Sequence, residues 1–308
     1  MTAMKGAFAV ASDRLSLIAY LLLAAVSIWW AGSYLLIKIA VLDVPPATLA
    51  TARLLIASTV LLIWLRLSDA GSLPRDLGSW ACFARIALFG HAFPLYLIAW
   101  ASLTLPVNEM AILVATTPLF AVLFAHLARR EWPSRATIFG LSAGFIGLAV
   151  FLSVSTVSTS HSSRSAAPLL ALLGAAASYA LSARAVARLQ GGNALVTGTA
   201  VMICAIPMLL PLSLAFERPW TIVPTAQAVG ALLLLGVGST AVVYVAYYRL
   251  IRLSGPAFAS MHHYLVPPSS ILLSAAFLGE KLDPTQMMLM APIIASVFIA
   301  RRLISRKL

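Results

Sequence analysis

The chain has 308 residues, of which 61% are apolar and 10% are charged, and its net charge is +12. Soluble domains carry about 25% charged residues, so this chain has too little polar surface for a water-soluble fold of its size. The basic residues sit in short segments between long apolar runs, which argues against a nucleic-acid partner and for orientation in a lipid bilayer. Nine acidic residues and two isolated cysteines, Cys82 and Cys204, give no basis for a metal site or a cofactor.

Ten apolar stretches are long enough to cross the bilayer, since a spanning helix needs about 20 residues. Alternating segments of about ten residues, which would indicate a barrel, are absent. The first stretch is too long for a cleaved signal peptide and is expected to be the first span. The expected spans are 15–39, 46–67, 80–103, 107–128, 135–155, 166–187, 195–215, 226–248, 257–278 and 285–304. The sequence therefore predicts an all-α membrane protein with ten transmembrane helices.

The basic residues alternate from one connecting segment to the next. With the N-terminus in the cytoplasm, 15 Lys and Arg residues fall in inside segments, whereas only Arg164, Arg218 and Lys281 fall in outside loops. Such an excess of basic residues marks the cytoplasmic side. We therefore expect both termini to be cytoplasmic and the protein to be a multi-pass protein of the inner membrane.

The two halves match each other at an offset of 149 residues. The matched pairs are Pro118 with Pro267, Glu131 with Glu280, Trp30 with Tyr179, and His91 with Thr240. Five spans in each half force opposite orientations, so this is an inverted repeat, an arrangement typical of secondary transporters. The expected organisation is a cytoplasmic segment 1–14, a first repeat 15–155, an extracytoplasmic linker 156–165, a second repeat 166–304 and a cytoplasmic tail 305–308.

Several short motifs resemble a known family. They are Trp30-Ala31-Gly32-Ser33 followed by Lys38, Pro45-Pro46 followed by Arg53, the stretch Thr104 to Pro118, and Pro267 to Leu278-Gly279-Glu280. Together they resemble two copies of the EamA domain of the drug/metabolite transporter superfamily. The sequence departs from the family pattern at Arg130-Glu131, where glycine-glutamate is usual, and at Ser178-Tyr179-Ala180, which lacks a tryptophan-glycine pair. The resemblance implies an exporter of amino acids, including aromatic ones, or of related metabolites.

Polar and aromatic residues at mid-membrane depth are the candidate substrate-binding residues, since such residues are rarely idle there. Trp30 and Tyr179 are repeat mates, and His91 lies at the middle of the third span. For Trp30 and Tyr179 ordinary helix packing is the alternative interpretation, and for His91 it is an imidazole hydrogen-bonded to a neighbouring helix. Adjacent helical residues point about 100° apart, so at most one of His262 and His263 is expected to face the cavity, and His263 is favoured.

The remaining candidates lie on the same spans. They are Thr117, Tyr96 and Tyr244 as further cavity residues, and Pro118 and Pro267 as hinge or gate residues, because proline weakens a helix locally. Tyr248 is a further candidate for the cavity, unless the Tyr247-Tyr248 pair belongs to the aromatic belt at the membrane surface. The cavity is expected between spans one, three, four, six, eight and nine, with spans five and ten at the periphery.

No acidic residue falls at mid-membrane depth in any expected span. This argues against a proton antiporter that uses a buried carboxylate, and proton coupling through histidine stays open. The alternative to a carrier is a membrane-embedded enzyme or a protein that handles lipids or nucleotide sugars. Enzyme motifs such as HExxH and GxSxG are absent, and no filter-like segment indicates a channel. A carrier for a small molecule is favoured, and a monomer is compatible with the sequence.

Overall fold

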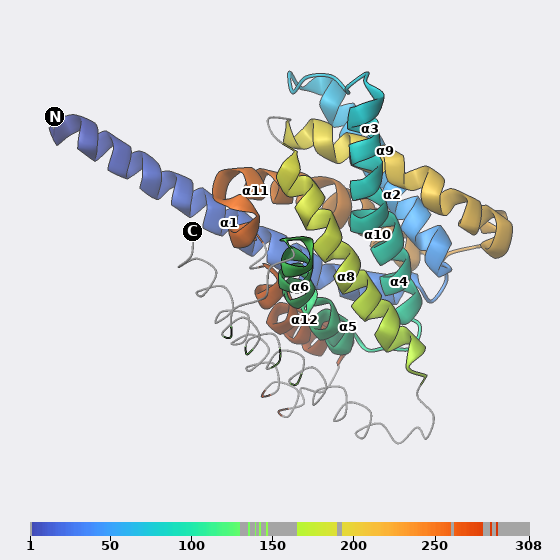
Figure 1. The fold of residues 1–308 in the computed structure, drawn as a ribbon. Coiled ribbons are helices and arrows are strands. Elements are labelled where there is room, and N and C mark those ends of the chain that lie inside the picture. The colour runs from blue at the N-terminus through green and yellow to red at the C-terminus, as the bar shows by residue number, and fades with distance from the viewer. Residues whose placement is uncertain are drawn as a thin grey trace.

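The computed structural model describes residues 2–129, 165–189, 193–259 and 262–279, together with six isolated positions (Figure 1). Within these residues the chain is helical and contains no strand. The expected fifth and tenth spans and the linker between the repeats lie outside the described residues, apart from those isolated positions and Ser165. Their expected peripheral place therefore stays a prediction.

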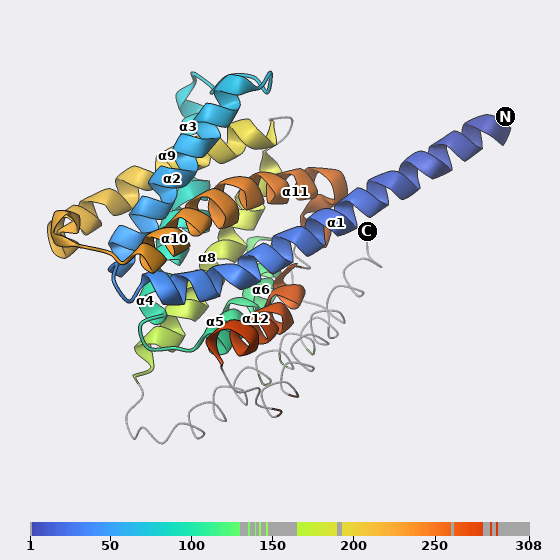
Figure 2. The same ribbon diagram turned by 180° about the vertical axis from the view of Figure 1, so that it is seen from behind.

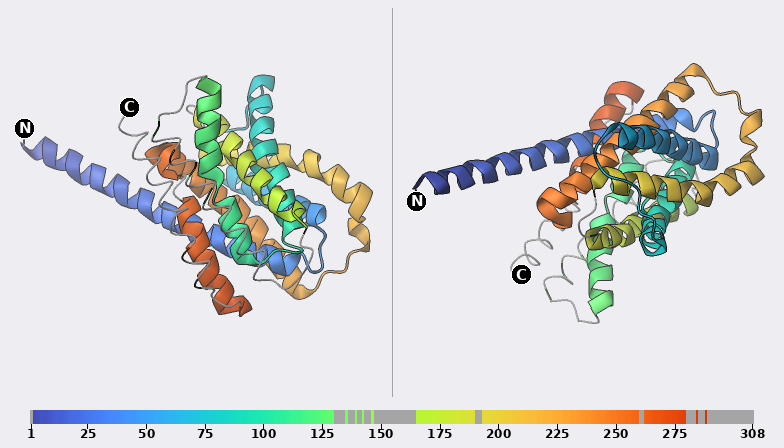
Figure 3. Two further views of the ribbon diagram at one scale, coloured as in Figure 1. Left: turned by 60° about the horizontal axis from the view of Figure 1, so that its bottom comes forward. Right: turned by 90° about the horizontal axis from the view of Figure 1, so that it is seen from above.

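Within the described residues, the first half of the chain has seven helical segments. They are α1 (Thr2–Ala40), α2 (Pro46–Leu67), α3 (Leu77–Ala87), the π-helical η1 (Leu88–Ala92), α4 (Phe93–Ala101), α5 (Val107–Val114) and α6 (Thr117–Arg129). Segments α3, η1 and α4 follow one another without a break and correspond to the expected third span. The α1 helix begins at Thr2, well before the expected start at residue 15, and its N-terminal end extends beyond the bundle (Figure 3).

The second half repeats this order. Its segments are α8 (Ala167–Arg188), α9 (Ala194–Leu212), η2 (Ser213–Glu217), η3 (Pro219–Thr221), α10 (Ala226–Leu234), η4 (Leu235–Val242), α11 (Val243–Ala259) and α12 (His262–Leu278). Seven described stretches are long and apolar enough to cross a membrane, and Leu265–Phe277 is a shorter apolar helix. Many large apolar side chains on these helices are exposed, among them Ile63 and Leu170, as expected for surfaces that face lipid.

The helices begin where the sequence supplies a partner for the unpaired amides of the first turn. Asp76 accepts from the Ser79 amide at the start of α3, at 2.7 Å. Asn193 accepts from the Leu195 amide at the start of α9, at 2.8 Å. Proline, which has no amide hydrogen to satisfy, occupies the first turn of α2 at Pro46. Local sequence thus sets several of the boundaries.

The packing of the two halves is reciprocal. Helix α1 packs against α12, and its repeat mate α8 packs against α5 and α6. Helix α1 also packs against α10 and α11 (Figure 2), and α8 packs against α3 and α4. The repeat mates α2 and α9 pack against each other. Each of these contacts between the halves therefore has a counterpart when the repeat mates are exchanged.

Two of the three π-helical segments in the described residues, η1 and η4, are also repeat mates, whereas the third, η2, lies at the end of its span. At the offset of 149 residues, His91 in η1 matches Thr240 in η4. A π-helical turn inside an α-helix is rare, loosens the regular backbone ladder and is frequent at functional sites. The same irregularity at matched places in both halves marks this depth of the bundle as the place to examine for a site.

Two carboxylates join the halves at one end of the bundle. Both oxygens of Glu217 accept from amides at the start of α2, those of Ala47 at 2.9 Å and Thr48 at 2.6 Å. Asp43, in the turn before α2, accepts from the amide and the hydroxyl of Thr225, at 2.9 and 2.5 Å. These hydrogen bonds lower the pKa of the Asp43 carboxyl, because they favour its charged form. The α1–α2 turn is thereby tied to the connection between α9 and α10.

Candidate functional site

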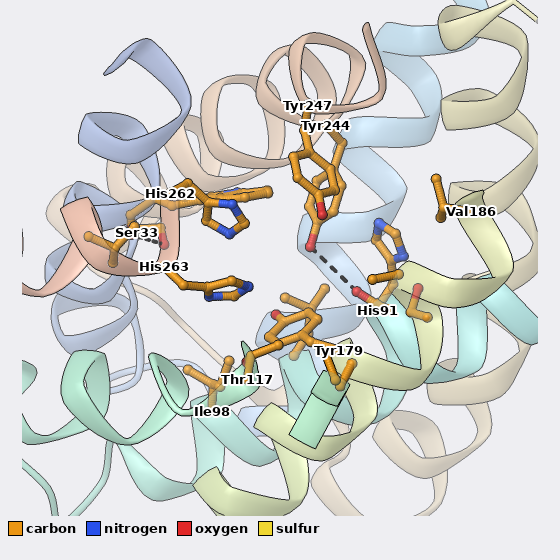
Figure 4. A pocket seen from close by; sticks show the side chains of 18 of the residues that line it. Ser33, His91, Ile98, Thr117, Tyr179, Val186, Tyr244, Tyr247, His262 and His263 are labelled. Carbon is orange, nitrogen blue, oxygen red and sulfur yellow. Dashed lines mark hydrogen bonds between the residues drawn. The ribbon is translucent and has the colours of Figure 1, made fainter. Parts of the chain in front are cut away.

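A cavity of about 250 Å³ lies between the halves, at the depth of the two π-helical segments. Its wall is built by α1, α2, η1, α4 and α6 from the first half and by α8, α11 and α12 from the second (Figure 4). All six spans expected to line a cavity do so, and α2 contributes as well, through Arg53. Pockets for drug-sized ligands hold about 300–1,000 Å³, so this cavity suits a smaller molecule.

Trp30 is the centre of an aromatic cluster in this wall. Its ring centroid lies 5.2 Å from that of Tyr244, 5.1 Å from that of Tyr247 and 4.5 Å from that of His262. The indole Nε1 donates to the carbonyl of Ser239 in η4, at 3.2 Å. The Trp30 ring is therefore held in place from two sides, by ring contacts and by one hydrogen bond across the repeat boundary.

Tyr244 makes the reciprocal contact on the other π-helical segment. Its hydroxyl donates to the carbonyl of Gly90 in η1, at 3.4 Å, as the dashed line in Figure 4 shows. Gly90 and Ser239 are matched positions of the repeat. The ring of Tyr244 also lies 4.3 Å from that of His91 and interacts with the side chain of Tyr179 on α8. One backbone carbonyl in η1 and one in η4 thus each accept a hydrogen bond from a cavity residue of the opposite half.

His91 is fully buried in η1 and borders the cavity. Neither of its ring nitrogens has a hydrogen-bond partner among the described residues. The Ile86 carbonyl lies near the ring but outside hydrogen-bonding geometry. A buried polar atom without a partner costs free energy, about 1–3 kcal/mol. The imidazole can therefore bind a polar group that enters the cavity.

Both histidines at the start of α12 line the cavity, which corrects the expectation that at most one would. Their ring centroids lie 3.9 Å apart, and His262 Nδ1 is 2.8 Å from the Ala259 carbonyl oxygen. The expectation assumed a helix that presents one side to the cavity. The rings of His262 and His263 instead lie against each other, and both side chains reach the cavity.

The other predicted residues divide into those in the wall and those behind it. Thr117 and Pro118 line the cavity at the break between α5 and α6, and the Thr117 hydroxyl donates to the Val114 carbonyl at 2.7 Å. Pro267 is buried inside α12 but is not a lining residue, although its neighbour Val266 is. Tyr96 is also absent from the wall and packs against a hydrophobic core cluster. The role of each as a binding or hinge residue stays a prediction.

Sequence reasoning missed one charged residue and placed two tyrosines ambiguously. Tyr247 and Tyr248 line the cavity and so do not form a surface belt. Arg53 also lines it and is only 3% exposed. Its position as the eighth residue of an apolar span could have indicated a functional role, since a basic residue at that depth needs an explanation.

The described residues contain no group of three His, Cys, Asp or Glu side chains suited to a metal ion.

Comparison with known proteins decides the family. The EamA-like transporter family matches residues 17–153 and again residues 166–302. The chain belongs to this family. The EamA-like pattern thus occurs twice and covers most of the chain, and the protein is a transporter with two EamA repeats in an all-helical membrane fold. Such a transporter is embedded in lipid and takes a small-molecule substrate.

The chain is similar along most of its length to three curated proteins. The "Uncharacterized inner membrane transporter YedA" of Escherichia coli K12 is 27% identical over 89% of this chain and 88% of its own. The "Uncharacterized transporter" of Archaeoglobus fulgidus is 26% identical over 86% and 90%. The "Probable terminal-alkyne amino-acid exporter" of Streptantibioticus cattleyicolor is 26% identical over 89% and 90%.

A solved structure, described only as a crystal structure of a protein, shares the fold. It has a TM-score of 0.65 and 18% identity, and the match covers 96% of this chain and 98% of that one.

The family, the seven apolar stretches and the inner-membrane relative together establish a multi-pass protein of the inner membrane.

Proposed function

We propose that this EamA-like transporter exports amino acids, including aromatic ones, through the cavity between its two repeats. The observation that carries the proposal is the composition of the wall: aromatic rings gather around Trp30, and polar groups such as His91 lie beside them. Aromatic contacts contribute about 0.5–1.5 kcal/mol each beyond burial. The relative named as an amino-acid exporter supports this substrate class.

The mechanism proposed is alternating access. The substrate side chain packs on Trp30 and Tyr179, which come from matched helices of the two halves, and its polar groups meet His91 and His263. Tyr244 and Thr117 complete the wall, and Tyr96 supports it from behind. Rocking of the halves around this site, with Pro118 and Pro267 as hinges, then exposes the cavity to each side in turn. No cofactor, metal or catalytic group takes part, so the protein is a carrier and not an enzyme.

The proposed architecture is ten spans in two inverted five-helix repeats, 15–155 and 166–304, with both termini in the cytoplasm. The reciprocal packing of the helices supports a repeat of this kind. Single cysteines in a cysteine-free variant test the topology through labelling with a membrane-impermeant maleimide. Ser160→Cys should react from outside and Arg135→Cys only after the membrane is opened. Cytoplasmic reactivity at position 160 would contradict the ten-span topology.

The transport proposal is tested with the purified protein in liposomes. Vesicles preloaded with one unlabelled amino acid should accumulate the same labelled amino acid by exchange, and protein-free vesicles should not. The panel comprises phenylalanine, tyrosine, tryptophan, leucine, threonine and lysine. We expect the fastest exchange with phenylalanine or leucine, because the cavity is small and mostly apolar. Absence of exchange with every amino acid, in protein that is folded by a thermal-unfolding assay, would refute the proposed substrate class.

A further inference from the structure

Arg53 differs from Lys38 and Arg184, two other basic residues that are not exposed within the apolar spans. Lys38 Nζ donates to the carbonyls of Ser102 and Leu105, at 2.7 and 3.0 Å, just beyond the end of α4. Arg184 Nη1 donates to the Phe124 carbonyl of α6, at 2.6 Å. These two cations are therefore bound to backbone oxygens of neighbouring helices. Arg53, in contrast, lines the cavity and bonds to no carbonyl among the described residues.

The guanidinium of Arg53 is held from one side only. Its Nε donates to the hydroxyl oxygen of Thr240, and that hydroxyl in turn donates to the Leu235 carbonyl of η4, at 2.7 Å. Because the Thr240 hydrogen is used in this way, its oxygen is oriented as an acceptor toward Arg53. An arginine has five N–H donors, and within the described residues the Nη atoms have no hydrogen-bond partner.

No carboxylate balances this charge in the cavity. The residues that interact with Arg53 electrostatically are three tyrosines and a histidine, none of them an acid: Tyr34, Tyr179, Tyr244 and His91. The described wall contains no Asp or Glu. A buried cation without a counter-ion is strongly unfavourable, and ionisable groups inside membrane proteins mark substrate or ion pathways. An anion that enters the cavity would supply the missing partner.

We propose that Arg53 binds the carboxylate of the transported substrate and that Thr240 is the residue that positions its guanidinium. This deepens the proposed function and rests on it. The planar guanidinium matches a carboxylate with two parallel N–H···O bonds, and the phenols beside it can donate to the same oxygens. The substrate side chain then packs on Trp30 and Tyr179, and its ammonium lies toward His91 and His263. The substrate class is therefore a small monocarboxylate with an apolar side chain, and an amine without the carboxylate binds more weakly.

The test compares three probes that share one ring: L-phenylalanine, 3-phenylpropanoate and 2-phenylethylamine. Each competes against exchange of labelled phenylalanine in liposomes, or of labelled leucine if phenylalanine is not exchanged, and each is also titrated against purified protein by calorimetry. The wild type should bind both carboxylates and bind the amine at least tenfold more weakly. Arg53→Gln should weaken the carboxylates about tenfold to hundredfold and leave the amine unchanged. Arg53→Lys should keep part of the preference.

Two further variants keep the proposal testable if Arg53→Gln does not fold. Thr240→Val should weaken carboxylate binding about threefold to tenfold, and Thr240→Ser, which retains the hydroxyl, should restore it. Arg184→Gln is the matched control, because it removes a cation bound to a helix carbonyl and should leave the preference for carboxylates intact. Equal weakening of carboxylate and amine by Thr240→Val or Arg53→Gln would overturn the proposal while amino-acid transport stands. A wild type that exchanges no amino acid would instead refute the proposed function.

Discussion

The indole of Trp30 in α1 donates to the carbonyl of Ser239 in η4, while the hydroxyl of Tyr244 in α11 donates to the carbonyl of Gly90 in η1. The two acceptors are matched positions of the repeat. Backbone carbonyls of both π-helical segments are therefore bound by side chains of the cavity wall. This relationship links the irregular backbone of each half to the aromatic cluster.

Trp30→Phe tests what the indole hydrogen bond contributes. Phenylalanine keeps an aromatic ring in the cluster but removes Nε1, so the Ser239 carbonyl loses its donor. We expect a loss of about 0.5–1.5 kcal/mol in stability, measured as thermal unfolding in detergent, together with weaker substrate binding. Tyr244→Phe should behave alike, because it removes the matching bond to Gly90. An unchanged stability in both variants would show that neither bond holds the cluster.

His91→Leu should separate function from stability. The imidazole has no hydrogen-bond partner among the described residues, so its replacement by an apolar side chain should not lower the unfolding temperature. Substrate affinity should nevertheless fall about five- to fifteenfold, which corresponds to about 1–1.5 kcal/mol.

Ser178→Ala is the control for this experiment. The Ser178 hydroxyl donates to the Phe89 carbonyl in η1, at 2.8 Å, and Ser178 does not line the cavity. It should lower stability without a comparable change in affinity. Normal affinity in His91→Leu would place the substrate away from this ring.

Gly236 and Gly230 should respond in opposite directions to alanine. A Cβ at Gly236 would press against the Ile56 side chain and lie 3.3 Å from the Arg53 carbonyl oxygen, whereas a Cβ at Gly230 would meet nothing within 4 Å. Overpacking of this kind typically costs about 1–3 kcal/mol. Gly230→Ala should be neutral or stabilising, because alanine is the better helix former. Equal unfolding temperatures for the two variants would contradict the close approach of η4 to α2.

The Asp43 carboxylate should stabilise the protein at neutral pH and lose this effect in acid. Its pKa is lowered by the hydrogen bonds from Thr225, so its contribution is complete above the ordinary pKa of about 3.9 and disappears as the pH falls through the lowered value. Asp43→Asn should therefore unfold at a lower temperature than the wild type at pH 7. The difference should shrink toward pH 3.

Asp69→Asn serves as the control, since Asp69 is exposed in the loop after α2. It should leave the unfolding temperature unchanged at both pH values. A difference between Asp43→Asn and the wild type that grows in acid would have the wrong sign for a carboxylate stabilised in its charged form.

Sequence alone could predict the membrane fold and the family, because apolar length and the doubled motif are properties of the chain that need no knowledge of packing. It also placed Trp30, His91 and Tyr179 near the middle of their spans, where the cavity lies. Depth along a helix follows from residue number. That these residues bind substrate stays a prediction.

The direction in which each side chain points could not be predicted in the same way. The π-helical segments shift the helical phase of the residues that follow them. Tyr247 and Tyr248, which follow η4, therefore face the cavity instead of the lipid surface. The break between α5 and α6 likewise places Pro118 at a helix start, whereas its mate Pro267 lies inside α12. Arg53 was overlooked because its partner Thr240 lies 187 residues away in the sequence.

The central claim, that the cavity is the substrate site, is tested most directly by substrate protection of a cysteine in its wall. Ala183→Cys is made in a variant without Cys82 and Cys204, and Ser72→Cys in the loop before α3 is the control. The rate of maleimide modification is measured with and without the amino acid that the liposomes exchange. Saturating substrate should slow the reaction at position 183 severalfold and leave position 72 unaffected. An unchanged rate at position 183, in a variant that still transports, would contradict the account.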